Sequence, residues 1–159
     1  MTGYRLGGID MILLPLSTYG FWYLMVANFR KKVFEILHPN NKIDLICDEA
    51  NTVVRNFKNA FSIANPRAQV NVFDMDTKFR SVSYSIKEAD SGIFVLKLIQ
   101  SHDGDTILCF EPEKAKALRE MRTYYLIVHP CNECLMPETK EILSKHVSLT
   151  CLLFFVYSI

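Results

Sequence analysis

An uncharged run near the N-terminus limits the folds open to this chain more than any other feature. From Met11 to Asn28 (MILLPLSTYGFWYLMVAN) no side chain is charged, and Arg30, Lys31 and Lys32 follow at once. The run is 18 residues long, which is the lower limit for a helix that crosses a membrane. The basic residues after it would then place the rest of the chain on the cytoplasmic side.

The composition of this run favours packing on the domain. Pro15, Gly20 and several hydroxyl groups make it only moderately apolar. A secretory signal peptide fits less well, because Arg5 is the only charge at its start and Asp10 lies where the apolar region should begin. We therefore expect a buried or amphipathic helix here, and a membrane anchor with the domain in the cytoplasm is the alternative.

The overall composition is that of one globular domain. The chain has 159 residues, of which 50% are hydrophobic and 22% charged, enough to close one hydrophobic core. A net charge of +1 argues against a broad nucleic-acid surface, which needs excess Lys and Arg, but leaves open a narrow pocket for a nucleotide. We expect an apolar, helical N-terminal segment at residues 1–40 and an α/β domain at residues 41–159, within one domain overall.

Hydrophobic periodicity indicates where helices and strands lie. Helices are expected at Phe21–Leu37 and from Asp48 to Phe61. In the first of these, Trp22 and Phe29 are expected to pack against apolar surface. Short strands are expected at Lys42–Cys47 and Arg80–Lys87. In the C-terminal half we expect a hairpin at Ile93–Phe110, a helix at Pro112–Met121, a strand at Thr123–Val128, a helix at Pro137–Lys145 and a strand at Val147–Tyr157. This order predicts an α+β or α/β fold with a single mixed β-sheet covered by helices. His38 and His102 lie beside turn residues and are expected to be exposed.

The five cysteines do not form a disulfide pattern, because their number is odd and their spacing uneven. Cys131 and Cys134 are separated by two residues, which in a reducing compartment indicates metal or redox chemistry first. The cytoplasm is the expected location.

Two short constellations combine thiols with a carboxylate. Cys109-Phe110-Glu111 precedes the helix expected at Pro112, and Pro130-Cys131-Asn132-Glu133-Cys134 follows the strand expected at Thr123–Val128. Three cysteine ligands leave an open fourth position on Zn²⁺, as catalytic zinc sites do. The metal lowers the pKa of its bound water, and a carboxylate that is not a ligand can shuttle protons.

This pattern resembles the zinc-dependent cytidine deaminase-like superfamily, whose signature is His/Cys-x-Glu followed by Pro-Cys-x-x-Cys. The resemblance implies a deaminase-like three-layer fold in which Cys109, Cys131 and Cys134 hold zinc and their sulfurs lie within about 4 Å of one another. Glu111 would be the catalytic acid/base in the hydrolytic deamination of a cytosine-type base. The implied partner is a small-molecule nucleoside or nucleotide, or a single exposed base, and a truncated or inactive relative would carry the same pattern.

Other interpretations of the same residues stay open. His129 and His146 offer a closed structural zinc site with the cysteine pair, and the pair alone offers a redox dithiol. Residues 68–128 are also similar in pattern to the end of a pleckstrin-homology or phosphotyrosine-binding domain, which would bind a peptide or a lipid headgroup. A membrane-anchored or interaction protein without chemistry is the last alternative.

Overall fold

The computed structural model describes residues 9–38, 43–82, 87–107, 111–129, 131, 132, 134 and 136–146. Within the chain, residues 1–116 and residues 117–159 form two compact units. The first unit contains the β-sheet and two of the helices, and the second contains most of α3 and all of α4.

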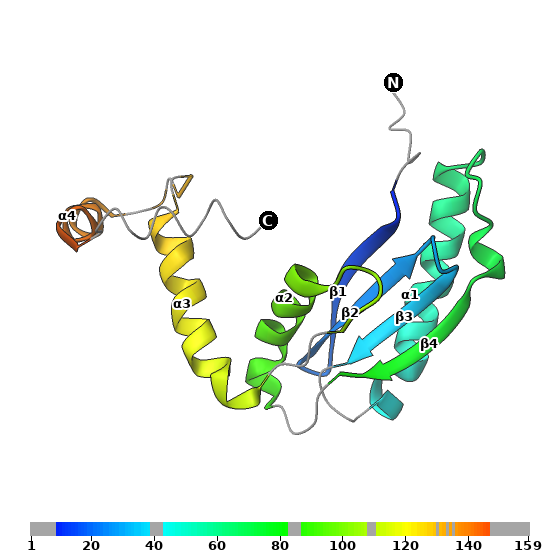
Figure 1. Ribbon diagram of the computed structural model, residues 1–159, viewed down its shortest axis with the longest axis horizontal. Helices are drawn as coiled ribbons and strands as arrows, with labels where there is room; N and C mark the ends of the chain where they lie inside the picture. Colours follow the sequence, from blue (N-terminus) through cyan, green and yellow to red (C-terminus); the bar gives the residue numbers. More distant parts are fainter. Residues whose placement is uncertain are drawn as a thin grey trace. The chain divides into compact units, whose positions relative to one another are not determined.

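A mixed four-stranded sheet forms the centre of the first unit (Figure 1). Its strands, in the order in which they lie side by side, are β1 (Met11–Thr18), β2 (Phe21–Asn28), β3 (Val33–His38) and β4 (Asp76–Ser81). β2 pairs antiparallel with both β1 and β3, and β3 pairs parallel with β4. The predicted mixed sheet covered by helices is thus confirmed, although it is built from a different part of the chain.

The uncharged run is a β-hairpin, so the helix predicted for it is wrong, as is the helix predicted at Phe21–Leu37. Tyr19 and Gly20 both have positive φ, at 46° and 80°, as the two central residues of a tight hairpin turn require. Pro15 is tolerated because β1 is an edge strand. β2 is buried on both faces from Tyr23 to Asn28, and a strand covered on both faces has the continuous apolar sequence that a buried helix also has.

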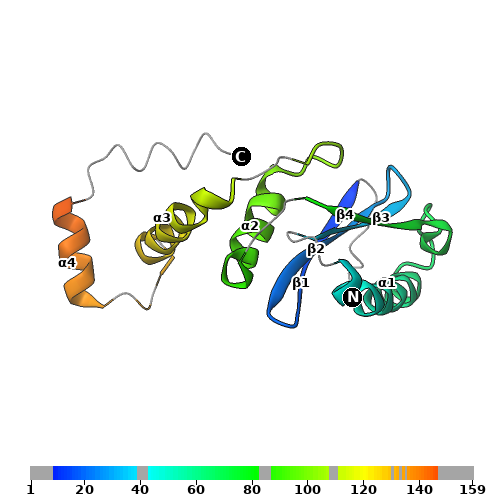
Figure 2. The ribbon, with the colours of Figure 1, turned by 90° about the horizontal axis from the view of Figure 1, so that it is seen from below.

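Two helices cover the two faces of the sheet (Figure 2). α1 (Ile43–Ala64) packs on one face through Ile46, Ala50 and Val54. α2 (Ser91–Ser101) packs on the other through Val95 and Leu98. The two cores alternate along β2, as side chains of a strand do: Tyr23, Met25 and Ala27 contact the α1 side, and Leu24 and Val26 the α2 side.

Several predicted strands are helical in the structure. Residues Ile93–Ile99, expected to form half of a hairpin, lie within α2, and residues 43–47, expected to form a strand, are the first turns of α1. A short apolar run carries no periodicity that separates a buried strand from a buried helix. The helix predicted from Asp48 to Phe61 is confirmed, and it ends near Asn65-Pro66 as predicted. Of the strand expected at Arg80–Lys87, the first two residues belong to β4, and residues 83–86 lie outside the described residues.

The last part of the described chain is helical. A short 3-10 helix, η3 (Pro112–Lys114), leads into α3 (Ala115–Val128), and α4 (Pro137–His146) follows. The start at Pro112 and the helix at Pro137 are confirmed, but the strand predicted at Thr123–Val128 is wrong because α3 continues through it. The strand predicted at Val147–Tyr157 lies outside the described residues. Among the described helices, none combines the length and apolar character needed to cross a membrane.

Candidate functional site

The residues of the predicted zinc and catalytic site belong only in part to the described residues. Cys109 lies outside the described residues. Glu111 is exposed at the start of η3, where its Oε2 pairs with Lys114 Nζ at 2.7 Å. Its carboxylate therefore interacts with a neighbouring ammonium group on the surface, which is a solvated and weakly stabilising arrangement.

Cys131 and Cys134 lie in the turn after α3, and both are exposed. The Cys131 backbone N–H donates to His129 Nδ1 at 3.1 Å, and the Cys134 backbone N–H donates to Asn132 Oδ1 at 3.1 Å. Asn132 also donates to the last carbonyl groups of α3, so its side chain serves as a C-terminal cap. Within the described residues no three His, Cys, Asp or Glu side chains are grouped to hold a metal. The ligand roles of Cys109, Cys131 and Cys134 remain a prediction, and the side chain of His146 lies outside those described.

The tip of the β1–β2 hairpin meets the start of α2. Ser91, the first residue of α2, is fully buried. Its hydroxyl oxygen accepts a hydrogen bond from the Trp22 backbone N–H at 3.0 Å, and its hydroxyl donates to the Glu88 carbonyl at 2.6 Å. One side chain thus joins the second strand, the short helix η2 (Glu88–Asp90) and α2.

Aromatic side chains are exposed at the same place. Trp22 is 44% exposed and Tyr19 is 81% exposed. The Trp22 ring lies against Gly92, since a Cβ added at Gly92 would lie 3.5 Å from Trp22 Cδ1. We call Tyr19, Trp22 and Gly92 the hairpin-tip surface. On β2 and β3 beside it, the Phe21 and His38 ring centroids are 6.1 Å apart, and His38 is buried instead of exposed as predicted.

The geometry at Ser91 does not suit a nucleophile. A serine nucleophile needs a neighbouring base to take its proton and a path for the substrate. The Ser91 hydroxyl donates its hydrogen bond to a backbone carbonyl, and the side chain is buried away from solvent. Reactive cysteines lie at helix N-termini or beside a cationic group. Among the described cysteines, Cys47 lies on the second turn of α1, where its sulfur accepts from Asn51 Nδ2 at 3.6 Å.

A second polar cluster surrounds Glu35 in the centre of β3. The Glu35 side chain is 5% exposed, and its Oε1 lies 2.7 Å from Arg80 Nη1 on β4. Its Oε2 lies 4.0 Å from Nε2 of His102, which follows α2 and is buried, contrary to the prediction. His102 Nδ1 is 3.1 Å from the Thr106 carbonyl oxygen, and because a carbonyl only accepts, Nδ1 carries the hydrogen. Oε2 and Nε2 therefore face each other without a hydrogen-bond partner among the described residues.

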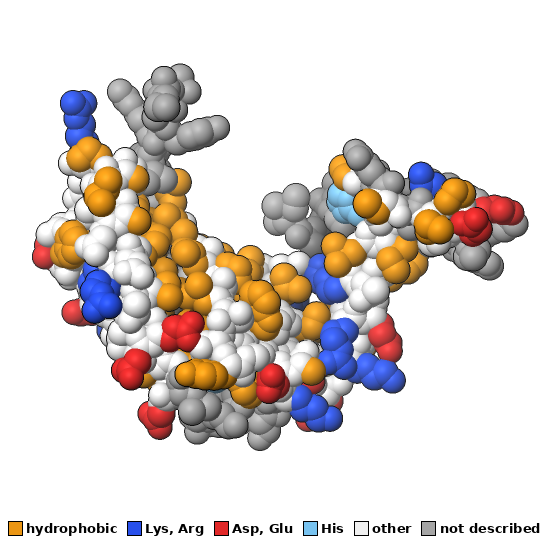
Figure 3. Space-filling view, turned by 180° about the vertical axis from the view of Figure 1, so that it is seen from behind, with side chains coloured by type: hydrophobic (Ala, Val, Ile, Leu, Met, Phe, Trp, Pro, Cys, Tyr) orange, Lys and Arg blue, Asp and Glu red, His pale blue; other side chains and the backbone are white. Residues whose placement is uncertain are grey.

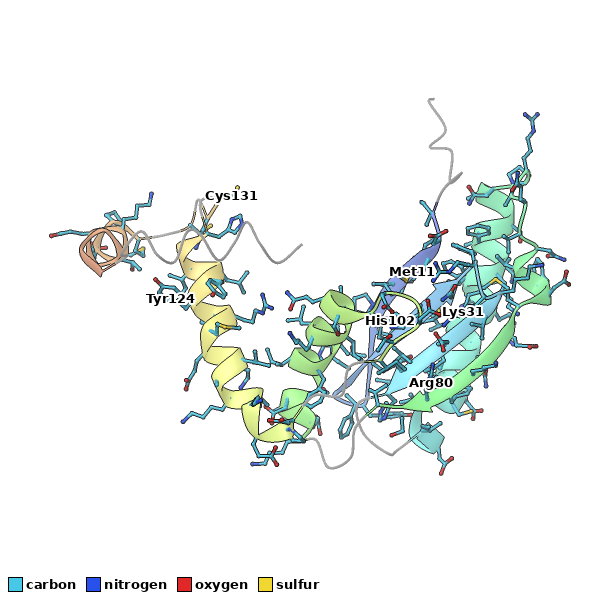
Figure 4. All side chains as sticks on the ribbon, in the orientation of Figure 1. Met11, Lys31, Arg80, His102, Tyr124 and Cys131 are labelled. Carbon is cyan, nitrogen blue, oxygen red and sulfur yellow. The ribbon has the colours of Figure 1, made fainter. Side chains whose placement is uncertain are left out.

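An open pocket lies beside this cluster. Its volume is about 570 Å³, and its lining comes from the β2–β3 turn, β3 and β4, with the residues Lys31, Val33, Glu35, Lys78, Phe79 and Arg80. Figure 4 labels Lys31, Arg80 and His102, which reach this region from three different segments.

Ion pairs connect the turn after α2 to the β2–β3 turn. Arg30 and Lys31 both pair with Asp105, at 2.9 and 2.6 Å. The Asp103 and Asp105 carboxyls have lowered pKa values, Asp103 chiefly through backbone N–H bonds and Asp105 chiefly through Lys31.

Sequence patterns alone did not point to these residues. The pair of Trp22 and Ser91 is 69 positions apart, and neither residue belongs to a motif of fixed spacing. One signal was present, since Asp90-Ser91-Gly92 before an apolar run is typical of a helix start. Glu35 gave a weaker signal, as a single charge within the apolar sequence VFEIL.

Comparison with solved structures identifies a related architecture. The chain is similar to the SUMO protease Ulp1 with its catalytic cysteine oxidised to a sulfenic acid, with a TM-score of 0.62 and 15% identity over 76% of this chain and 54% of the other. It is equally similar to the C-terminal Ulp1 protease domain in complex with Smt3, the yeast ortholog of SUMO, with a TM-score of 0.63 and 15% identity over 76% and 53% of the two chains. The fold resembles that of the Ulp1 protease domain. This chain spans about half the length of those structures. No protein-family model and no curated protein matches it.

These similarities overturn the resemblance to cytidine deaminases. The resemblance placed an expected strand at Thr123–Val128 between the two cysteine segments, and these residues are part of α3. The sheet is formed by residues 11–38 and 76–81, and its architecture is similar to that of a protease domain. The zinc-dependent deaminase, the small-molecule nucleoside partner and the pleckstrin-homology-like alternative are therefore wrong. The Ulp1 domain in one matching structure has a protein partner instead.

Proposed function

We propose that this chain is a protein-binding domain of Ulp1-like fold, which binds a small folded modifier protein of the SUMO kind through its hairpin-tip surface. The likeness in fold supports this assignment, because one of the similar structures is a complex with Smt3. The substrate and partner are proposals for this chain, which covers about half of that structure.

The observation that carries the proposal is the exposure and fixed position of Trp22. Its side chain is 44% exposed, its backbone is held by Ser91, and its ring lies against Gly92. Tyr and Trp supply a large contact area at low conformational entropy and dominate the binding energy of protein interfaces. A tryptophan that is already fixed in position loses little further entropy when a partner covers it.

Binding without cleavage fits the positions of Ser91 and Cys47 better than nucleophilic catalysis by either residue. Ser91 is closed to solvent, and Cys47 interacts with an amide on its own helix. The Ulp1 protease of one similar structure, by contrast, has a catalytic cysteine, which is oxidised there to a sulfenic acid. We therefore expect the chain to recognise its partner and leave the peptide bond intact.

Smt3 bearing a C-terminal vinyl sulfone, which traps an attacking thiolate, tests both parts of the proposal. The expected result is reversible binding, measured by calorimetry, without a covalent adduct in the mass spectrum. Trp22→Ala should weaken binding at least about tenfold. The matched control is Phe73→Ala, which removes an aromatic side chain that is 53% exposed on the 3-10 helix η1 (Val72–Asp74) and should leave binding unchanged.

Two outcomes would contradict the proposal. An adduct on any cysteine would show thiol chemistry, and peptide mapping would then identify the nucleophile. Equal affinities of Trp22→Ala and the unmodified chain would remove the hairpin-tip surface from the interface.

A further inference from the structure

A second surface lies at the far edge of the sheet, away from β1. β4 is the last strand of the sheet, and only β3 pairs with it among the described residues (Figure 1). On the α2 side of the sheet, the core contains residues of β2 and β3 and of α2 but none of β4. Lys78 and Arg80 consequently remain exposed on this side of β4.

The pocket beside β4 has an excess of positive charge. Lys31, Lys78 and Arg80 line it together with Glu35. Lys31 pairs with Asp105 and Arg80 pairs with Glu35, while the Lys78 ammonium group has no ion pair among the described residues. An acidic group that enters the pocket would therefore contact the ammonium group of Lys78 and the side of the Arg80 guanidinium group that does not contact Glu35. On the face shown in Figure 3, by comparison, acidic and basic side chains are scattered over the surface.

The edge and the charge together indicate one kind of occupant. An edge strand presents unpaired backbone N–H and C=O groups, to which an extended peptide can add as a further strand. Side chains two residues apart lie on the same face of a strand, as Lys78 and Arg80 do. We propose that β4 binds an extended segment of a protein partner with acidic side chains at alternate positions, which lie over Lys78 and Arg80.

Glu35 positions Arg80 for this role. Its carboxylate is buried on the central strand and holds Arg80 Nη1 at 2.7 Å, while 45% of the Arg80 side chain stays exposed. The guanidinium group thus keeps a fixed orientation and still offers donors to a second carboxylate, since it carries five N–H groups. This surface is formed by other residues than the hairpin-tip surface and does not depend on the proposed binding of a modifier protein.

A fluorescent peptide of alternating Glu and Val tests the proposal by anisotropy with the full chain. We expect binding that weakens when salt is raised from about 0.15 M to about 0.5 M, because exposed charges are screened. A peptide of alternating Lys and Val should not bind. Lys78→Glu should weaken binding of the acidic peptide at least about tenfold, from the loss of one charge and the gain of a repulsive one. Lys78→Arg should retain the affinity for the acidic peptide.

Two controls separate strand addition from attraction of charge alone. Arg55→Glu makes the same charge change on the exposed side of α1 and should leave the affinity unchanged. An acidic peptide methylated on alternate backbone nitrogens keeps its charge but cannot form the ladder hydrogen bonds, so its binding should be lost. Retained binding of the methylated peptide, equal affinity of Lys78→Glu, or absence of binding at low salt would each overturn the proposal.

Discussion

The backbone N–H of Trp22 donates a hydrogen bond to the hydroxyl oxygen of Ser91, with 3.0 Å between the two heavy atoms. This contact joins the tip of the first hairpin to the start of α2. It places an exposed tryptophan ring over Gly92, and it engages the one hydroxyl group at that helix start in a structural role.

Replacement of Ser91 by alanine should destabilise the fold by about 1–2 kcal/mol, because the partly buried Trp22 N–H and Glu88 carbonyl both lose their hydrogen-bond partner. Urea denaturation measures the free energy of unfolding. Ser101→Ala is the matched control, since the Ser101 hydroxyl donates to the Lys97 carbonyl within its own helix and its removal should cost less. Equal losses in the two variants would argue against the role of Ser91.

Removal of Arg80 should cost more than removal of the charge on Glu35. Arg80→Ala leaves a buried carboxylate without its partner, and we expect a loss of about 2 kcal/mol, below the value for fully buried pairs because Arg80 is partly exposed. Glu35→Gln should cost less, since the amide needs no countercharge. In the double variant the two losses should not add, with a coupling of about 1 kcal/mol. Additive losses in denaturation experiments would refute this coupling.

Stability should fall in alkaline solution through Tyr23. Burial, followed by the charge of Glu49, raises the pKa of Tyr23 from 10.0 to about 12. The folded state therefore holds this proton more tightly than the unfolded chain does. The corresponding stabilisation is complete below pH 10 and is lost as the pH rises to about 12, by on the order of 2 kcal/mol. Tyr23→Phe should remove this part of the pH dependence, and an unchanged profile would contradict the assignment.

Gly20→Ala should destabilise the first hairpin by about 1 kcal/mol, because φ at this position is +80°. An added Cβ would also meet the end of the Glu88 side chain, which is flexible and can move aside. Gly20→Asn should cost less, since asparagine tolerates positive φ. The order of the two variants in thermal unfolding checks whether the backbone conformation sets the cost.

Local sequence determined those elements whose apolar residues repeat on one face. The helix α1 was predictable from Ala50, Val54 and Phe57, which recur at the helical spacing while the intervening residues are largely polar. Pro112 and Pro137 marked helix starts for the same local reason, since a proline suits the first turn of a helix and disrupts its interior. The α+β class with a mixed sheet was predicted correctly, but the strands from which it was predicted at Ile93–Ile99 and Thr123–Val128 are helical, and the sheet is formed by residues 11–38 and 76–81.

Only the tertiary structure decided which apolar runs are strands and which are helices. Residues 21–28 and 93–99 are both nearly continuous in apolar character, yet the first is a central strand and the second lies in a helix on that strand. Each is covered by the other, so the choice depends on partners far away in the chain. The pairs Trp22 with Ser91 and Glu35 with Arg80 arise in the same way, 69 and 45 positions apart. Such contacts have no fixed spacing in the sequence, because the sheet pairing and the helix packing bring them together.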